Sequence, residues 1–263
     1  VDRMYIGHIP DIGALALTGV GVCMPIIMLI TAFAALVSMG SAPRASVLMG
    51  RNDNEEAHYT LGNSFIMLII IALVLTVFFR RFAEPILMAF GASENTIGYA
   101  MDYMRIYTLG TIFVQFALGL NAFITAQGFA KISMATVVIG AVINIVLDPI
   151  FIFGFHMGVK GAALATILSQ AVSAIWVLRF LTGKKTILKL QKKYFRLKGS
   201  VVGPCLLLGM SPFIMQATES AISVCFNSSL YRYGGDIAVG AMSILTSIMQ
   251  FSMLPLQGFT QGA

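Results

Sequence analysis

The sequence predicts an all-α integral membrane protein, a polytopic bundle of roughly seven to eight apolar helices. Of its 263 residues, 58% are hydrophobic and 11% are charged, whereas about 25% of an ordinary soluble domain is charged. The charges are clustered and leave long uncharged windows at 61–79, 106–130 and 132–147. Each window approaches the ~20 residues that cross ~30 Å of hydrocarbon. A water-soluble domain is therefore excluded.

Apolar runs between charged or Gly/Pro-rich breaks predict the order of the helices. The first is the end of a helix that reaches about His8, and because the chain begins with Val1 rather than Met we expect a fragment. The other helices are expected near 14–38, 60–79, 97–124, 133–154, 159–181, 201–230 and 237–261.

Positive charge is divided unevenly between the two ends of these helices. When alternate loops are assigned to alternate sides, eleven Lys and Arg residues fall on one side and five on the other, with Arg105 at a helix edge. Cytoplasmic loops of membrane proteins carry the excess of positive charge, so the first side is expected to be cytoplasmic. The same rule explains the net charge of +6 without a nucleic-acid partner. The expected location is the cell membrane (inner or cytoplasmic), crossed several times.

A basic segment divides the helices into two groups, with eight Lys and Arg residues between Arg179 and Lys198. A weak similarity between residues 10–42 and 235–263 indicates two parallel halves. The expected parts are an N-terminal lobe of six helices with a truncated first helix over 1–182, a cytoplasmic basic linker over 183–200, and the first two helices of a C-terminal lobe over 201–263.

The linker has a helical periodicity of its own. Within residues 184–198, Ile187, Leu190, Tyr194 and Leu197 recur at spacings of three and four, with lysines on the remaining faces. This pattern predicts an interfacial amphipathic helix. The alternative is a solvated basic linker that only fixes the topology.

Asp148 is a carboxylate inside an apolar run, which is rare in membrane helices. A charged Asp at the bilayer centre costs about 2.5–3.5 kcal/mol on insertion scales, so it normally faces a polar cavity or binds a proton or ion. Asn144 lies four residues earlier on the same helix face, and Pro149 frees a carbonyl about one turn back. We therefore expect a cation or proton site, although the two polar side chains could instead only tie neighbouring helices together.

Other polar residues lie beside apolar runs. Thr166 follows small residues that permit close helix approach, and it either takes part in a site or only bonds its own backbone. Asp102 and Arg105, three residues apart, are expected to form a local ion pair. Glu219, with Gln216 nearby, marks a possible second site, and the alternative is a carboxylate neutralised by an unidentified partner.

Several function classes lack their motifs. An intramembrane enzyme needs paired acidic motifs for a metal-diphosphate, an HExxH or a Ser/His dyad, and the sequence has none of them, so no enzyme is expected. The three cysteines lie in apolar stretches without CxxC spacing and predict no metal site. A purely structural membrane protein leaves Asp148 and Glu219 unexplained.

Residues 118–170 resemble the multidrug and toxic compound extrusion (MATE) transporters, especially their bacterial multidrug-export branch. The N-x-x-x-D-P at 144–149, followed by GVxGAAxAT at 158–166, carries the resemblance, and weaker similarity covers nearly the whole chain. It implies part of a twelve-helix transporter with two six-helix lobes. The chain would supply most of one lobe and the first two helices of the other.

The resemblance implies a secondary active antiporter that exports diverse, often cationic or amphipathic drugs or toxins by alternating access. The coupling ion would be a proton or Na⁺, with no further cofactor, and the full-length protein would be a monomer. A lipid-linked precursor flippase of the same superfamily is the alternative, and the few positive charges within the N-terminal spans argue against it. By resemblance, the cation-binding residues would be Asp2, Asp148, Asn144, Thr166 and Tyr103. Glu219 resembles an acidic residue of the seventh helix and, with Gln216 beside it, marks a possible second-lobe site.

Overall fold

The computed structural model describes residues 2–10 and 12–262 and their side chains, except those of 251 and 254–262. Most of these residues lie in long apolar helices. The described residues include five helices long and apolar enough to cross a membrane, and a bent pair of helices that forms a sixth span. Apolar side chains cover their outer surface, as Val138, Val142 and Val146 do on one helix. Such a surface suits lipid, and the predicted polytopic all-α membrane bundle is confirmed.

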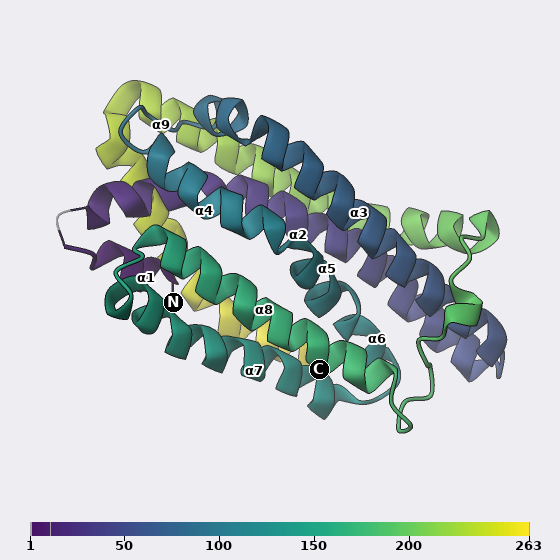
Figure 1. The fold of residues 1–263 in the computed structure, drawn as a ribbon. Helices are drawn as coiled ribbons and strands as arrows, with labels where there is room; N and C mark the ends of the chain where they lie inside the picture. Colours follow the sequence, from purple (N-terminus) through teal and green to yellow (C-terminus); the bar gives the residue numbers. More distant parts are fainter. Residues whose placement is uncertain (1, 11, 263) are drawn as a thin grey trace.

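The helices follow the predicted order, and several are longer than their apolar windows (Figure 1). The bounds are α1 Asp2–Gly7, α2 Gly13–Gly50, α3 Asn54–Ala89, α4 Ile97–Leu109, α5 Thr111–Gly119, α6 Asn121–Ala126, α7 Ala130–Pro149, α8 Val159–Leu181 and α9 Gly199–Gly262, with a π-helical turn at Ile150–Gly154 and a 3₁₀ turn at Lys192–Tyr194.

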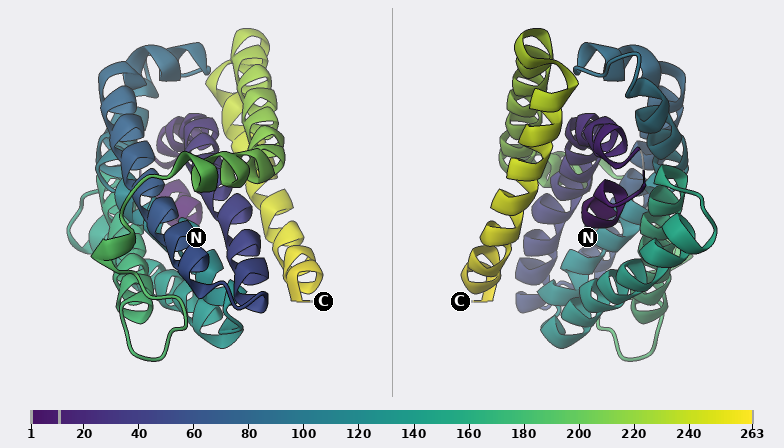
Figure 2. Two further views of the ribbon diagram at one scale, coloured as in Figure 1. Left: turned by 90° about the vertical axis from the view of Figure 1, so that its right-hand side faces the viewer. Right: turned by 90° about the vertical axis from the view of Figure 1, so that its left-hand side faces the viewer.

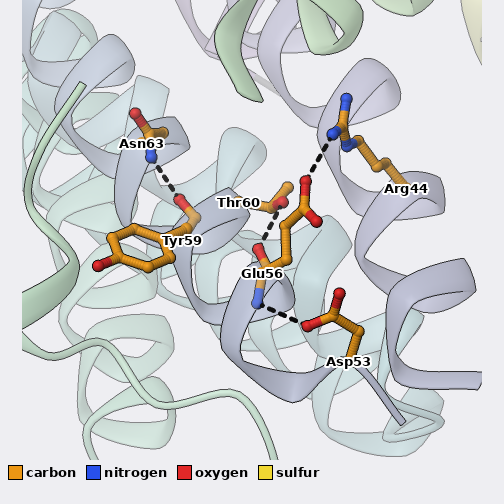
Figure 3. A network of polar contacts seen from close by, with 6 residues as sticks. All are labelled: Arg44, Asp53, Glu56, Tyr59, Thr60 and Asn63. Carbon is orange, nitrogen blue, oxygen red and sulfur yellow. Dashed lines mark hydrogen bonds and ion pairs between the residues drawn. The ribbon is translucent and has the colours of Figure 1, made fainter. Parts of the chain in front are cut away.

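Polar contacts fix the corner between α2 and α3 (Figure 3). The Asp53 carboxylate accepts a hydrogen bond from the backbone N–H of Glu56 at 3.2 Å and so caps α3. The Glu56 side chain forms an ion pair with Arg44 of α2 at 3.0 Å. Because the α3 cap and the interhelix ion pair share Glu56, the start of α3 is held against the end of α2.

The expected single helix over 97–124 is wrong, because the structure breaks it into α4, α5 and α6. The break after α4 bends the span by 58°. Gly110 lies at this break, and a Cβ atom there would overlap the side chain of Ile167 in α8. In α5, Gln115 donates a hydrogen bond to the carbonyl of Ile30 in α2 at 2.9 Å. The bend thus follows from close packing against α8 and α2, which hydropathy does not record.

The expected amphipathic helix over 184–198 is also wrong, since only the 3₁₀ turn within it is helical. Gln127 is buried, and its Oε1 accepts hydrogen bonds from the Thr186 hydroxyl at 2.7 Å and from the backbone N–H groups of Ile187 and Leu188 at 2.9 and 2.8 Å. Donors bonded to Gln127 are unavailable for helical hydrogen bonds. At the other end, the Lys198 N–H donates to Asn63 Oδ1 at 2.8 Å. The linker is thus an irregular strap across the end of the bundle.

Gly235 divides α9 into two arms, 199–234 and 236–262. Its φ of 64° and ψ of −161° lie where a glycine is favoured, and the chain reverses there (Figure 2). The first arm runs antiparallel to α2, because Gly209 lies against Leu36 and Ser220 bonds to Pro25. The second arm runs parallel to α2, with Ser243 against Gly21. Asp11, near the start of the first copy of the proposed repeat (10–42), lies outside the described residues.

Candidate functional site

Asp148 lies near the C-terminal end of α7. The helices α1 and α8 pack against α7 (Figure 1). The exposed fraction of Asp148 is 0%. The Asn144 side-chain amide, one turn earlier, donates to Asp148 Oδ1 at 3.3 Å. The other oxygen, Oδ2, is buried and has no hydrogen-bond partner among the described residues. A buried acceptor without a donor is costly, so Oδ2 is the atom of this site most in need of a cation or proton.

Asp2, at the start of α1, places a second carboxylate beside Asp148. The Thr166 hydroxyl of α8 donates to Asp2 Oδ2, and the same hydroxyl lies 3.0 Å from the backbone carbonyl of Ala162. Asp2 and Asp148 are near enough for their charges to interact. The structure therefore places four predicted residues from three helices around one polar centre, joined by two side-chain hydrogen bonds.

Local sequence explains why α8 can approach so closely. α7 ends at Pro149, which lacks a backbone N–H, and the chain continues through the π-helical turn. Gly161 of α8 packs on this turn, and a Cβ atom there would lie 2.7 Å from the carbonyl of Phe151. A glycine at 161 thus permits the contact that sets Thr166 beside α1.

Tyr103, the fifth residue of the predicted cation site, is buried on α4. Its ring stacks on that of Tyr107, with centroids 5.9 Å apart and planes 17° apart. Asp2 and Thr166 are among its polar neighbours. Tyr103 therefore forms a wall of the same centre.

Arg3 is a residue that sequence reasoning counted only as a loop charge. Its guanidinium donates from Nη1 to the Ser243 carbonyl at 3.2 Å and to Ser247 Oγ at 2.6 Å, both on the second arm of α9. The only sequence signal is that Arg3 directly follows Asp2 in the first turn of α1. Arg3 connects the helix that carries Asp2 to α9.

The structure does not bring Glu219 and Gln216 to this centre. Glu219 is exposed on the first arm of α9, and no hydrogen bond or ion pair joins it to another described residue. Its neighbour Ser220 donates to the Pro25 carbonyl of α2 at 2.8 Å. The second-lobe site stays a prediction.

The expected Asp102–Arg105 pair is replaced by a contact between helices. Asp102 pairs with Lys160 at the start of α8, with 3.5 Å between Oδ1 and Nζ. Residues three apart can meet on a helix, but their side chains diverge when one of them meets a partner from another helix. Arg105 instead faces a groove between α3 and α4.

The membrane-spanning fold, with the buried Asp148 carboxylate beside Asp2, defines a polytopic α-helical membrane protein with a polar centre. Residues 1–150 match the sequence profile of the MatE family. The chain belongs to this family.

Relatives and solved structures agree with this assignment. A multidrug export protein MepA from Staphylococcus haemolyticus is 29% identical over 246 residues, which cover 94% of this chain and 54% of MepA. A structure described as the inward-facing conformation of a multidrug resistance MATE family transporter has a TM-score of 0.92 at 26% identity, covering 98% of this chain and 58% of its own. The MATE multidrug transporter DinF-BH, solved as a complex, has a TM-score of 0.92 at 35% identity over 99% and 58%.

The chain spans little more than half the length of these proteins. Similarity over nearly all of this chain and part of each relative agrees with the expected partial transporter.

Proposed function

We propose that the complete protein is a secondary active antiporter that exports diverse, often cationic or amphipathic small molecules in exchange for protons or Na⁺. The observation that carries the proposal is Asp148, a carboxylate buried in a membrane helix, with one oxygen lacking a partner among the described side chains. Ionised carboxylates at such depth are expensive and mark ion pathways. A visiting cation would supply the missing partner.

The pair of carboxylates supports charge exchange. With both ionised, Asp2 and Asp148 repel each other, and a proton or Na⁺ bound between them relieves that repulsion. Asn144 and Thr166 each donate to one carboxylate, so Asp148 Oδ2 is left to receive the incoming cation. Loading and release of the cation would then shift the balance between two conformations.

Arg3 supports a connection from this centre to the other helices. It follows Asp2 in α1 and bonds to Ser243 and Ser247 of α9. A change in the charge or position of Asp2 would move the neighbouring Arg3, and through its hydrogen bonds the second arm of α9. Alternating access requires such a link between the two groups of helices.

The test is Asp148→Asn in the complete protein, reconstituted in proteoliposomes loaded with a cationic dye. The variant keeps the shape of the side chain and removes its charge, so efflux driven by an ion gradient should fall about tenfold or more, within the usual range of coupling energies. Asp102→Asn is the matched control, because Asp102 pairs with Lys160 away from the carboxyl pair. Equal efflux by the two variants would remove Asp148 from the mechanism.

Separate proton and Na⁺ gradients then identify the coupling ion. Efflux under one gradient and not under the other assigns the ion, whereas efflux of dye under neither gradient contradicts antiport. We further propose that the complete protein works as a monomer in the cell membrane, with the basic linker on the cytoplasmic side. A lipid-linked precursor flippase is not proposed, since the similar proteins are described as multidrug transporters.

A further inference from the structure

A groove of about 350 Å³ lies between the C-terminal part of α3 and α4, away from the carboxyl pair. Four charged side chains line it: Arg80, Arg81 and Glu84 from α3, and Arg105 from α4. The groove lies at the end of the bundle opposite the strap, because the N-terminal part of α3 contacts the strap at Asn63 and the helix runs away from it toward Arg80. By the distribution of Lys and Arg together this is the non-cytoplasmic end, which carries the smaller share of the positive charge.

These charges are not neutralised within the described part of the chain. All four side chains are exposed, and no ion pair joins any of them to another described residue. Arg81 also lies over the Phe82 ring, 5.5 Å from its centroid. Arginine stays protonated in proteins, so three arginines and one glutamate leave this groove with a net charge of +2. An anionic ligand is favoured.

Apart from Thr108, the remaining lining residues are apolar, and the uncharged windows of the sequence indicate that the groove lies at the depth of the lipid headgroups. The uncharged window 61–79 ends directly before Arg80, and the window 106–130 begins directly after Arg105. The arginines therefore stand at the border between hydrocarbon and water on both helices. On the hydrocarbon side of Arg105 the groove is lined by Ile106 and Leu109 of α4, and Leu109 is 57% exposed. A free inorganic anion would make no favourable contact with this apolar wall, whereas the acyl chain of a lipid would.

We propose that this groove binds a phospholipid of the phosphatidylglycerol type in the non-cytoplasmic leaflet. The headgroup phosphate pairs with the arginines, whose planar donors match phosphate oxygens. Glu84 accepts hydrogen bonds from the glycerol hydroxyls, and an acyl chain lies along Ile106 and Leu109. The site explains three arginines at the membrane end where positive charge is otherwise sparse.

Native mass spectrometry of the complete protein tests the site by counting the phosphatidylglycerol molecules retained after delipidation and titration. The test variant is Arg80→Gln with Arg105→Gln. The matched control is Arg179→Gln with Arg232→Gln, which removes the same charge from exposed arginines outside the groove. Each arginine at a membrane surface contributes about fivefold to the affinity for an anionic lipid. We expect one retained lipid whose affinity falls at least that much in the test variant and not in the control.

Three results would overturn the site. The first is equal retention of phosphatidylglycerol by the test and control variants, and the second is retention of phosphatidylcholine as strong as that of phosphatidylglycerol. The third is displacement of the lipid by inorganic phosphate, which would indicate a site for a free anion. Arg80→Lys with Arg105→Lys keeps the charge and guards against misfolding. That variant should elute as the parent does on gel filtration and bind the lipid more tightly than the Gln variant but less tightly than the parent, because lysine keeps the charge and lacks the planar donors. None of these measurements depends on transport.

Discussion

The hydroxyl of Ser93 donates a hydrogen bond of 3.0 Å to Asp236 Oδ2, which joins the turn between α3 and α4 to the second arm of α9. Nearby, Gly91 lies against the Asn227 carbonyl at the end of the first arm, and a Cβ atom there would be 2.9 Å away. Both contacts are at the end of the bundle opposite the strap. They hold α9 against the preceding helices where Gly235 reverses the chain.

Ser93→Ala should loosen this end of the molecule. A hydrogen bond to a charged group contributes about 1.5–3 kcal/mol, so its loss should raise the population open at this end by about tenfold. Pulsed electron paramagnetic resonance between spin labels at the exposed positions 94 and 232 measures that population in the complete protein. Ser46→Ala is the control, because Ser46 lies near the C-terminal end of α2, at the strap end of the bundle, and its hydroxyl bonds to the Ala126 carbonyl instead of to α9. Identical distance distributions in both variants would contradict the role of the Ser93–Asp236 bond.

Thr166→Val should impair coupling while Thr166→Ser preserves it. Valine has nearly the shape of threonine but cannot donate to Asp2 Oδ2, whereas serine retains the hydroxyl. Loss of a hydrogen bond to a carboxylate corresponds to about tenfold or more in efflux rate. Ion-driven dye efflux from proteoliposomes measures it. If serine and valine variants lose activity equally, packing and not the hydroxyl is what matters at this position.

Gly209→Ala should disrupt the crossing of α2 and α9. A Cβ atom at 209 would overlap the carbonyl oxygen of Leu36, and backbone cannot move aside as a side chain can. Overpacking of this kind costs about 1–3 kcal/mol. Thermal unfolding in detergent should show a lower Tm for Gly209→Ala. Gly203→Ala is the matched control in the same helix, because nothing lies within 4 Å of its added Cβ. Equal Tm values for the two variants would refute the close approach.

Gln127→Leu should release the strap from the end of the bundle. The leucine cannot accept the hydrogen bonds from Thr186, Ile187 and Leu188, and buried donors left without partners cost about 1–3 kcal/mol each. Limited trypsin digestion should then cleave at Lys184 and Lys189 about tenfold faster. The control is Gln191→Leu, an exposed linker residue. Unchanged cleavage of the Gln127 variant would show that the strap is held by other contacts.

Hydropathy and spacing predicted the helices and the centre of the candidate site. Long apolar windows located the spans because a helix in lipid must satisfy its own backbone and expose an apolar surface. The Asn144–Asp148 pair followed from a four-residue spacing, which puts both side chains on one helix face. Thr166 was a candidate from its sequence context, and the family resemblance added Asp2, but no local pattern predicted that the two are partners, since they lie 164 positions apart.

The sequence by itself determined that this protein is a bundle of membrane helices with a carboxylate at position 148, because composition and helical periodicity are properties of short segments. Only the tertiary structure decided that the span after residue 97 bends at Gly110, that Gln127 holds the linker irregular, and that Arg3 reaches α9. Each of these depends on the close approach of a distant segment. Such contacts are set by the packing of whole helices, whose geometry no local pattern records.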